Sequence, residues 1–182
     1  MKRDQVKEKY KWNTSDLFAT DEEWEQKLKE AEKLLDFAKY EGKLSDRDTL
    51  LKFFKANDEF GKLFERLEVY AHMRHDEDAN VTKYGAFYSR IMSLYTKYAT
   101  ELSFYEPEMA ALDEEYLNSL ISDSRFADYD YDLKRIIARK PHVASREEER
   151  LVGMSGEILE NFYDSFSAID TLDLPLPEIE WN

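Results

Sequence analysis

Hydrophobic residues recur every three or four positions along most of the chain, the spacing that places them on one face of an α-helix. Glycine and proline are scarce, whereas the strong helix formers Glu, Lys, Leu and Ala are abundant. The first clear helix start is TDEE, where Thr20 is placed to cap and Glu23 to complete a capping box. The apolar stripe that follows includes Trp24 and Leu28, and we predict that this helix ends near Gly42.

Two long helices are predicted to form the centre of the fold. The first opens at Ser45 with Asp48 and carries an apolar face as far as Ala71. After the polar break DEDAN, the second runs from about Val81 to the Glu-Pro dipeptide at 106–107, which disfavours continuation of a helix. A short acidic connection between two long helices predicts an antiparallel hairpin.

Shorter helices are expected to complete the fold. Asp113 begins one, and another covers roughly residues 129–139. The motif SREE, with Ser145 as its cap, starts a further helix that extends toward Phe166. The chain is therefore predicted to be all-α, a multi-helix bundle built on the long hairpin.

The last residues follow a different pattern. In LDLPLPEIEW, leucine alternates with other residues from position 172 onward and two prolines interrupt the run, which favours an extended edge segment over a helix. We therefore divide the chain into a helical lobe, residues 1–171, and an extended C-terminal tail, residues 172–182. No partner strand for the tail is evident, so we expect it to lead toward a domain that is missing from this sequence.

Composition narrows the classes of partner. The 182 residues include 26 Lys and Arg against 40 Asp and Glu, a net charge of −14, which disfavours nucleic acid and anionic membrane surfaces. Cysteine is absent, which excludes disulfides and thiolate metal sites. The start, MKRDQVKEKYKW, lacks the apolar core of a secretory signal, and no window has the length of a membrane span. We expect a soluble, cytoplasmic protein.

The stretch VYAHMRHDED holds the strongest candidate metal site. Glu68, His72 and His75 are spaced i, i+4 and i+7, so their side chains are able to gather around one ion. However, His75 falls on the apolar stripe and His72 does not, and Glu68 with His72 is also an ordinary surface pair near the end of a helix. The zinc protease motif His-Glu-x-x-His is not matched, because here the two histidines are three apart.

Other candidate sites are also weak. Asp76, Glu77 and Asp78 resemble the start of a calcium loop, but positions six and twelve are Val81 and Phe87, where that loop requires glycine and glutamate. We interpret the acidic residues instead as caps, at Asp78 or Asn80, for the next helix. His142 lies in a loop and has no partner that the sequence identifies, and GMSG at 153–156 lacks the lysine and the preceding strand of a phosphate loop.

Aromatic residues offer a further alternative. Tyr84, Tyr88, Tyr95 and Tyr98 recur at helical spacing and could line a peptide-binding cleft, although core packing accounts for them more simply. Carboxylates are so numerous that no pair is distinguished as acid and base. We therefore assign no catalytic, cofactor-binding or metal-binding residue within the chain.

Several segments together resemble one family. These are YKWNTSDLF, DEEW, LEVYAHMRHDEDAN, FYEPE and KPHVASREEERL, which occur in this order. The chain, from about Tyr10 to Ile179, resembles the N-terminal portion of oligoendopeptidase F, a zinc metallopeptidase of the thimet oligopeptidase group. The resemblance implies a cytoplasmic enzyme, much longer than this chain, that hydrolyses short peptides inside a mostly helical, two-lobed shell.

The resemblance implies that none of the family's catalytic or zinc-binding residues lies within this sequence. The family's His-Glu-x-x-His helix and its third zinc ligand, a glutamate, belong to a later part of the polypeptide, so zinc is expected in the complete enzyme and not in these 182 residues. The chain alone is expected to be inactive and to serve as a lobe that covers the substrate channel and limits access to it. Its expected partners are the missing C-terminal catalytic domain and an oligopeptide substrate. A truncated lobe should also self-associate. The alternative is a stand-alone helical module that binds a protein or a peptide without catalysis.

Overall fold

The computed structural model describes residues 6–140, 146–170 and 174, and every regular element in these ranges is helical. The predicted all-α fold is confirmed. The extended tail predicted for residues 172–182 lies outside the described residues, except for Leu174. The α-helices are α1 (Asp21–Leu34), α2 (Arg47–Glu77), α3 (Thr82–Glu101), α4 (Tyr105–Ala111), α5 (Glu114–Ile121), α6 (Asp130–Arg139) and α7 (Arg146–Ala168). Short 3-10 helices are η2 (Glu8–Tyr10), η3 (Thr14–Asp16), η4 (Ala38–Tyr40), η5 (Leu102–Phe104) and η6 (Ser124–Tyr129).

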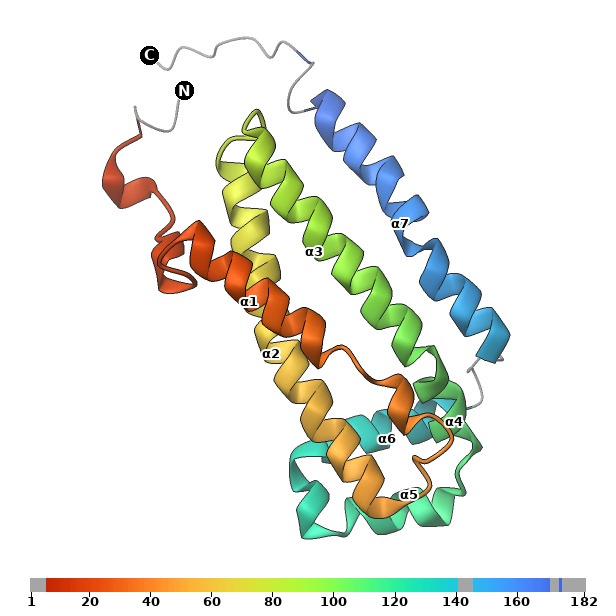
Figure 1. Ribbon diagram of the computed structural model, residues 1–182. Helices are drawn as coiled ribbons and strands as arrows, with labels where there is room; N and C mark the ends of the chain where they lie inside the picture. Colours follow the sequence, from red (N-terminus) through yellow and green to blue (C-terminus); the bar gives the residue numbers. More distant parts are fainter. Residues whose placement is uncertain (1–5, 141–145, 171–173, 175–182) are drawn as a thin grey trace, which may run out of the picture.

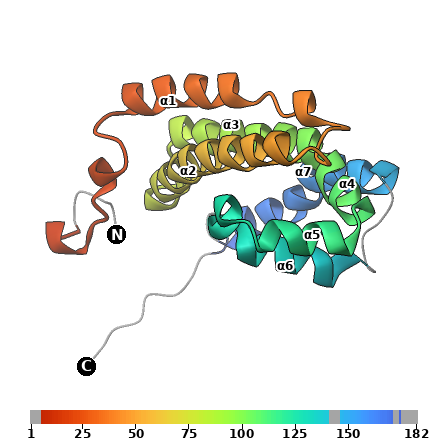
Figure 2. The same cartoon turned by 90° about the horizontal axis from the view of Figure 1, so that it is seen from below.

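The antiparallel pair α2 and α3 forms the centre of the molecule, as the sequence predicts (Figure 1). Helix α1 packs across α2, and α7 lies along the outer side of α3 (Figure 1). Helices α4, α5 and α6 gather at the end of the hairpin where α2 begins and α3 ends, on the side away from α1 (Figure 2). The hairpin is therefore covered along its length by α1 and α7 and at one end by the three shorter helices.

The start of α1 agrees with the predicted capping box. The side chain of Thr20 accepts a hydrogen bond from the backbone N–H of Glu23 at 3.2 Å. The carboxylate of Glu23 reaches back to the N–H of Ala19, at 2.8 Å, instead of the cap residue itself. Both backbone donors are thus satisfied at the helix entrance.

The end of α1 differs from the prediction, because the helix ends at Leu34 and not near Gly42. The chain leaves the helix so that Phe37 can enter the core, where it is fully buried. Glu101 accepts the backbone N–H of Phe37 at 2.8 Å, which replaces a hydrogen bond that a continued helix would have made. Gly42 has a φ of 73°, a left-handed conformation that suits glycine, so it forms the turn before α2.

The ends of the hairpin helices also differ in detail. The cap of α2 is Asp46, one residue after the predicted Ser45, and its carboxylate accepts the N–H of Thr49 at 2.8 Å. Helix α3 ends at Glu101, before the predicted 106–107 boundary, and continues through η5 into α4. Pro107 lies in the first turn of α4, where its missing N–H is tolerated. Its ring conflicts with a helical carbonyl four residues earlier, which accounts for the tighter 3-10 turn there.

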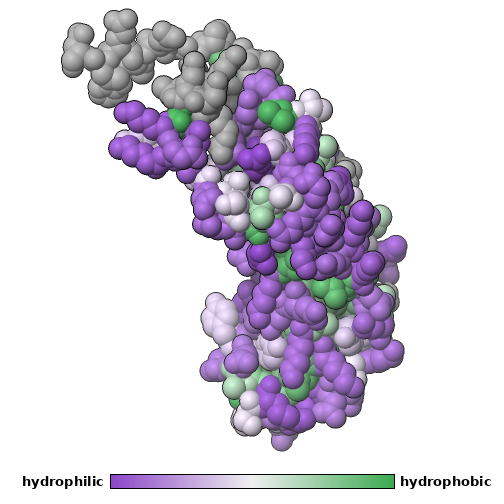
Figure 3. Space-filling model, turned by 60° about the vertical axis from the view of Figure 1, so that its left-hand side comes forward, coloured by the Kyte–Doolittle hydropathy of each residue, from purple (hydrophilic) through white to green (hydrophobic). Residues whose placement is uncertain are grey.

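The core is rich in aromatic contacts between helices. Phe37 makes edge-on contacts with Phe53, Phe60 and Tyr98, with ring centroids 5.8–6.0 Å apart. Trp24 stacks on Phe87 at 4.1 Å and donates its indole N–H to the carbonyl of Leu67 at 2.9 Å, so it joins α1 to both helices of the hairpin. The face drawn in Figure 3 is mostly hydrophilic with small apolar areas, as expected for a highly charged chain.

Candidate functional site

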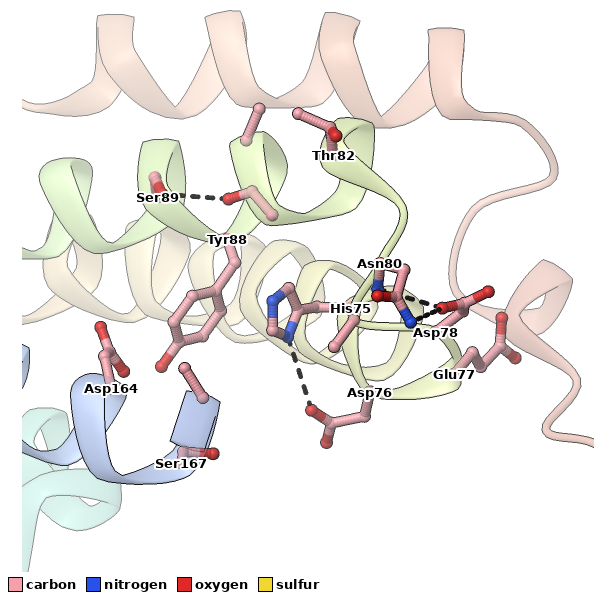
Figure 4. A pocket seen from close by; sticks show the side chains of 14 residues that line it. His75, Asp76, Glu77, Asp78, Asn80, Thr82, Tyr88, Ser89, Asp164 and Ser167 are labelled. Atoms are coloured by element: carbon pink, nitrogen blue, oxygen red, sulfur yellow. Dashed lines mark hydrogen bonds and ion pairs between the residues drawn. The ribbon is translucent and has the colours of Figure 1, made fainter. Parts of the chain in front are cut away.

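A cleft of about 910 Å³ lies at the tip of the hairpin, between the turn that joins α2 to α3 and the last turns of α7. The end of α2 contributes His75 and Asp76, α3 contributes Tyr88 and Ser89, and α7 contributes Asp164, as Figure 4 shows. Segments far apart in the sequence therefore meet at one place. This cleft contains part of the stretch that the sequence identifies as a candidate metal site.

The two histidines flank one tyrosine. The ring of His75 stacks on Tyr88 with centroids 5.6 Å apart, and His72 approaches the same ring at 5.4 Å. His75 also lies against the backbone of α3, because a Cβ atom on Gly85 would be only 3.8 Å from the imidazole. The half-buried His75 is therefore packed between helices and is not directed toward a shared ion with His72.

The hypothesised metal ligands do not assemble. Nδ1 of His72 lies 3.3 Å from Glu68, and its Nε2 lies 3.4 Å from Asp76, so His72 bridges two carboxylates along its own helix. His75 stacks on Tyr88, and its Nδ1 lies 3.8 Å from the carboxylate of Asp76 (Figure 4). Within residues 6–140, 146–170 and 174, no group of three or more His, Asp or Glu side chains could hold a metal ion. The hypothesis of a metal site at Glu68, His72 and His75 therefore has no support in the described residues.

The turn between the hairpin helices is held by its own side chains. The carboxylate of Asp78 accepts the backbone N–H of Asn80 at 3.0 Å and its side-chain amide at 3.2 Å (Figure 4). The cap of α3 is Val81, which makes no side-chain capping bond. The prediction that Asp78 or Asn80 caps α3 is therefore wrong, because the Asp78 carboxylate is used within the turn itself.

The cleft is acidic. Its lining includes the carboxylates of Asp76, Glu77, Asp78 and Asp164, and no lysine or arginine belongs to the described residues that line it. One of these carboxylates, that of Glu77, is paired with the guanidinium of Arg74 at 3.0 Å. Such a lining attracts cationic groups and repels phosphate. It does not pair a nucleophile with a base, so the geometry supports binding more than catalysis.

A half-buried polar cluster joins three helices, and no local pattern in the sequence predicts it. Asp21 of α1 accepts the hydroxyl of Tyr70, from α2, at 2.6 Å and the ammonium of Lys83, from α3, at 2.6 Å. Tyr84 adds a longer bond to the same carboxylate at 3.4 Å and also accepts from Arg74. The residues are up to 63 positions apart, so only folding brings them together.

Ionisation in this cluster follows from burial and pairing. Burial opposes the charge on Asp21, but the hydrogen bonds from Lys83 and Tyr70 outweigh it and lower the pKa of that carboxyl. Burial, reinforced by the hydrogen bond to Asp21, raises the pKa of Tyr70. Asp21 is therefore a charged anchor and Tyr70 a neutral donor, which is the arrangement of a structural clamp.

The remaining candidate residues have varied outcomes. His142 and Ser145 lie outside the described residues. GMSG lies inside α7, and Gly153 allows that helix to approach the backbone of Ala99 in α3. Of the tyrosine stripe, Tyr84, Tyr88 and Tyr98 are half-buried and only Tyr95 is exposed. Tyr98 packs on Phe60 at 4.6 Å, as the core interpretation predicts.

Comparisons with known proteins agree with the helical fold. A model for the N-terminal region of M3 peptidases, described as Oligopeptidase F, matches residues 108–175, from α4 to just beyond α7. The chain is 35% identical over 181 residues to group B oligopeptidase PepB of Streptococcus agalactiae, which covers 98% of this chain and 30% of that protein. It is 30% identical over 181 residues to oligopeptidase PepF of Bacillus subtilis, which covers 98% of this chain and 27% of that protein.

A solved structure shows the same arrangement of helices. Oligoendopeptidase-F from Enterococcus faecium superposes with a TM-score of 0.78 at 27% identity, over 89% of this chain and 32% of that one. The chain thus spans about 30% of the length of the relatives that it matches. No helix within the described ranges is long and apolar enough to cross a membrane.

These matches identify the family to which the chain belongs. A helical lobe that aligns over nearly its whole length with named oligopeptidases corresponds to one region of those proteins. The chain belongs to the oligoendopeptidase F family and corresponds to the N-terminal part of its members.

Proposed function

We propose that this chain is the noncatalytic N-terminal lobe of a cytoplasmic zinc metalloendopeptidase that hydrolyses oligopeptides. The observation that carries the proposal is the alignment of 98% of the chain with 30% of an oligopeptidase at 35% identity. The later part of the polypeptide would supply the zinc ligands and the activated water, because the described side chains form no ligand set for the ion.

The role of the lobe would be steric. Helices α1, α2 and α3 are held together by contacts between aromatic rings and by the Asp21 cluster. They therefore form a wall that resists local opening. A wall of this kind above a substrate channel admits short, flexible peptides and excludes folded proteins. The lobe would thus limit which substrates reach the metal without contacting the bond that is cleaved.

A hydrolysis assay tests this proposal. The 182-residue chain alone should not cleave a quenched fluorescent oligopeptide, whereas a longer polypeptide that also carries the catalytic part should do so in a zinc-dependent manner. The longer polypeptide should leave a folded protein substrate intact. Zinc-dependent cleavage by the chain alone would refute the noncatalytic assignment, and equal cleavage of folded proteins would refute the steric role.

The alternative of a stand-alone binding module predicts a different gene product. Its native mass would be near 21.7 kDa, the mass of this chain, whereas the peptidase proposal predicts a substantially larger polypeptide. Intact mass spectrometry of the protein from its natural source separates the two.

A further inference from the structure

Helix α7 presents most of its apolar side chains to solvent. Leu151, Val152, Met154, Phe162, Tyr163 and Phe166 are between 51% and 74% exposed, and Ile169, directly after the helix, is 52% exposed. We call these seven residues the outward face of α7. They make up more than half of the large apolar side chains that are exposed in the described part of the chain. So dense a group on one helix marks an interaction surface.

The side of α7 that contacts the hairpin is of a different kind. Gly153 lies on the backbone of Ala99, with only 3.6 Å between a Cβ built on the glycine and the Ala99 carbonyl oxygen. In the last five residues of the helix, Asp164 and Ser167 line the cleft beside Tyr88 (Figure 4). Small and polar residues thus allow α7 to approach α3, and the large side chains are left on the other side of the helix.

Within residues 6–140, 146–170 and 174, no helix covers the outward face. Helix α7 runs along the outer side of α3, at the edge of the bundle opposite α1 (Figures 1 and 2). Its sequence contains two arginines but six acidic residues, and the whole chain has a net charge of −14. An anionic lipid surface is therefore a poor partner for this helix, whereas an apolar protein surface is a suitable one.

We propose that the outward face of α7 packs against the later part of a longer polypeptide, the part that the relatives possess beyond the aligned region. This inference rests on the proposed function. The matched relatives are about three times as long as the aligned region, since the chain covers 30% of them. The family model includes the whole of α7, so this helix is a regular component of the N-terminal region and is not peculiar to this chain.

Single cysteines can test the proposal cleanly, because the chain contains none. We would prepare Phe166→Cys on the outward face and Tyr131→Cys as the control, since Tyr131 is 75% exposed and belongs to α6 instead of α7. The rate of maleimide modification is measured for each variant alone and after addition of the Bacillus subtilis relative from which the aligned N-terminal region has been removed.

Modification at position 166 should slow at least tenfold on addition, with no change at position 131. An unchanged rate at position 166 would overturn the proposal. If modification at position 166 instead slows with the concentration of the chain alone, and the added polypeptide has no further effect, the face serves self-association and the proposal is also wrong. Should the shortened relative be insoluble, the same two cysteines are compared in a chimera in which this chain replaces the aligned region.

Hydrolysis measured in the same samples separates this inference from the proposed function. Cleavage of an oligopeptide without slower modification at position 166 would leave the function standing and refute the interface. Slower modification at position 166 without cleavage would support the interface and refute the proposed function for this chain.

Discussion

Helices α1 and α7 both flank the α2–α3 hairpin, yet they use opposite faces to do so. In α1 the apolar stripe of Trp24, Leu28 and Ala31 is fully buried against the hairpin. In α7 the large apolar side chains that the structure describes are exposed to solvent, and Gly153 contacts the backbone of Ala99. Both helices are amphipathic, so amphipathicity alone does not reveal which neighbour a helix is built to meet. The difference is the basis of our proposal that α7 connects the lobe to a later part of a longer polypeptide, whereas α1 packs within the lobe.

The largest loss of stability is expected for a substitution in the buried stripe of α1. Trp24→Ala removes the stack on Phe87 and the hydrogen bond to Leu67, and should lower the free energy of unfolding by about 3–5 kcal/mol. Phe162→Ala on α7 is the matched control, because its ring is exposed, and should change the same quantity by less than about 0.5 kcal/mol. Urea unfolding followed by circular dichroism measures both. A similar loss in the two variants would contradict the outward orientation of α7.

Substitution of Gly153 tests the contact between α7 and α3. Gly153→Leu should displace α7 from Ala99 and cost about 1–3 kcal/mol, because a Cβ at this position would already be in contact with the Ala99 backbone, at 3.6 Å, and the leucine side chain extends beyond it. Gly156→Leu is the control, since nothing lies within 4 Å of a Cβ built there, and it should stabilise the helix by roughly 0.5–1 kcal/mol through better helix propensity. Hydrogen exchange of α7 amides reports the displacement directly. Equal protection in both variants would argue against this packing.

The polar clamp on the α1 side should depend on pH. Asp21→Asn weakens charged hydrogen bonds from Tyr70 and Lys83, and should cost about 1–3 kcal/mol at pH 7. The folded-state pKa of Asp21 is lowered from 3.8, so its contribution is fully present above about pH 4 and is lost as the pH falls through the folded value. The difference between wild type and variant should therefore shrink below pH 4 in unfolding titrations.

The control for this clamp is Glu65→Gln, which removes an exposed carboxylate elsewhere on α2 and should leave the pH profile of stability nearly unchanged. A difference between wild type and Asp21→Asn that persists undiminished at pH 2 would contradict the assignment of a charged anchor at Asp21.

The smallest effect is expected at the histidines of the hairpin tip. His72 bridges two carboxylates on the helix surface, so His72→Ala should change stability by less than about 0.5 kcal/mol. Calorimetric titration of the chain with zinc should give no binding heat. A heat that disappears in both His72→Ala and His75→Ala would restore the metal hypothesis.

Much of the fold could be predicted because helices leave a local signature. The Thr20 cap, the hairpin and the order of the helices follow from spacing and capping residues close together in the sequence. Errors occurred where distant groups intervened. The end of α1 is set by Glu101, which takes the backbone N–H of Phe37 from 64 positions away. The cap of α3 is a separate, local case, because the Asp78 carboxylate bonds to Asn80, two residues away, instead of to the start of the helix.

The candidate site was harder to predict than the fold. His72 and His75 are near neighbours on one helix, and both contact the ring of Tyr88, which belongs to α3. The Asp21 cluster and the contribution of Asp164 to the cleft likewise require separate helices to meet. Side-chain directions at such junctions are fixed by packing, which a local pattern does not contain.

The sequence by itself determined an acidic, cysteine-free, helical chain with an antiparallel hairpin, because hydrophobic period, capping and charge are properties of neighbouring residues. Only the tertiary structure decided where the helices end, which ring occupies the space between two histidines, and that α7 turns its apolar residues outward. Those outcomes depend on competition between surfaces for burial, and that competition is settled only when all the helices are present together.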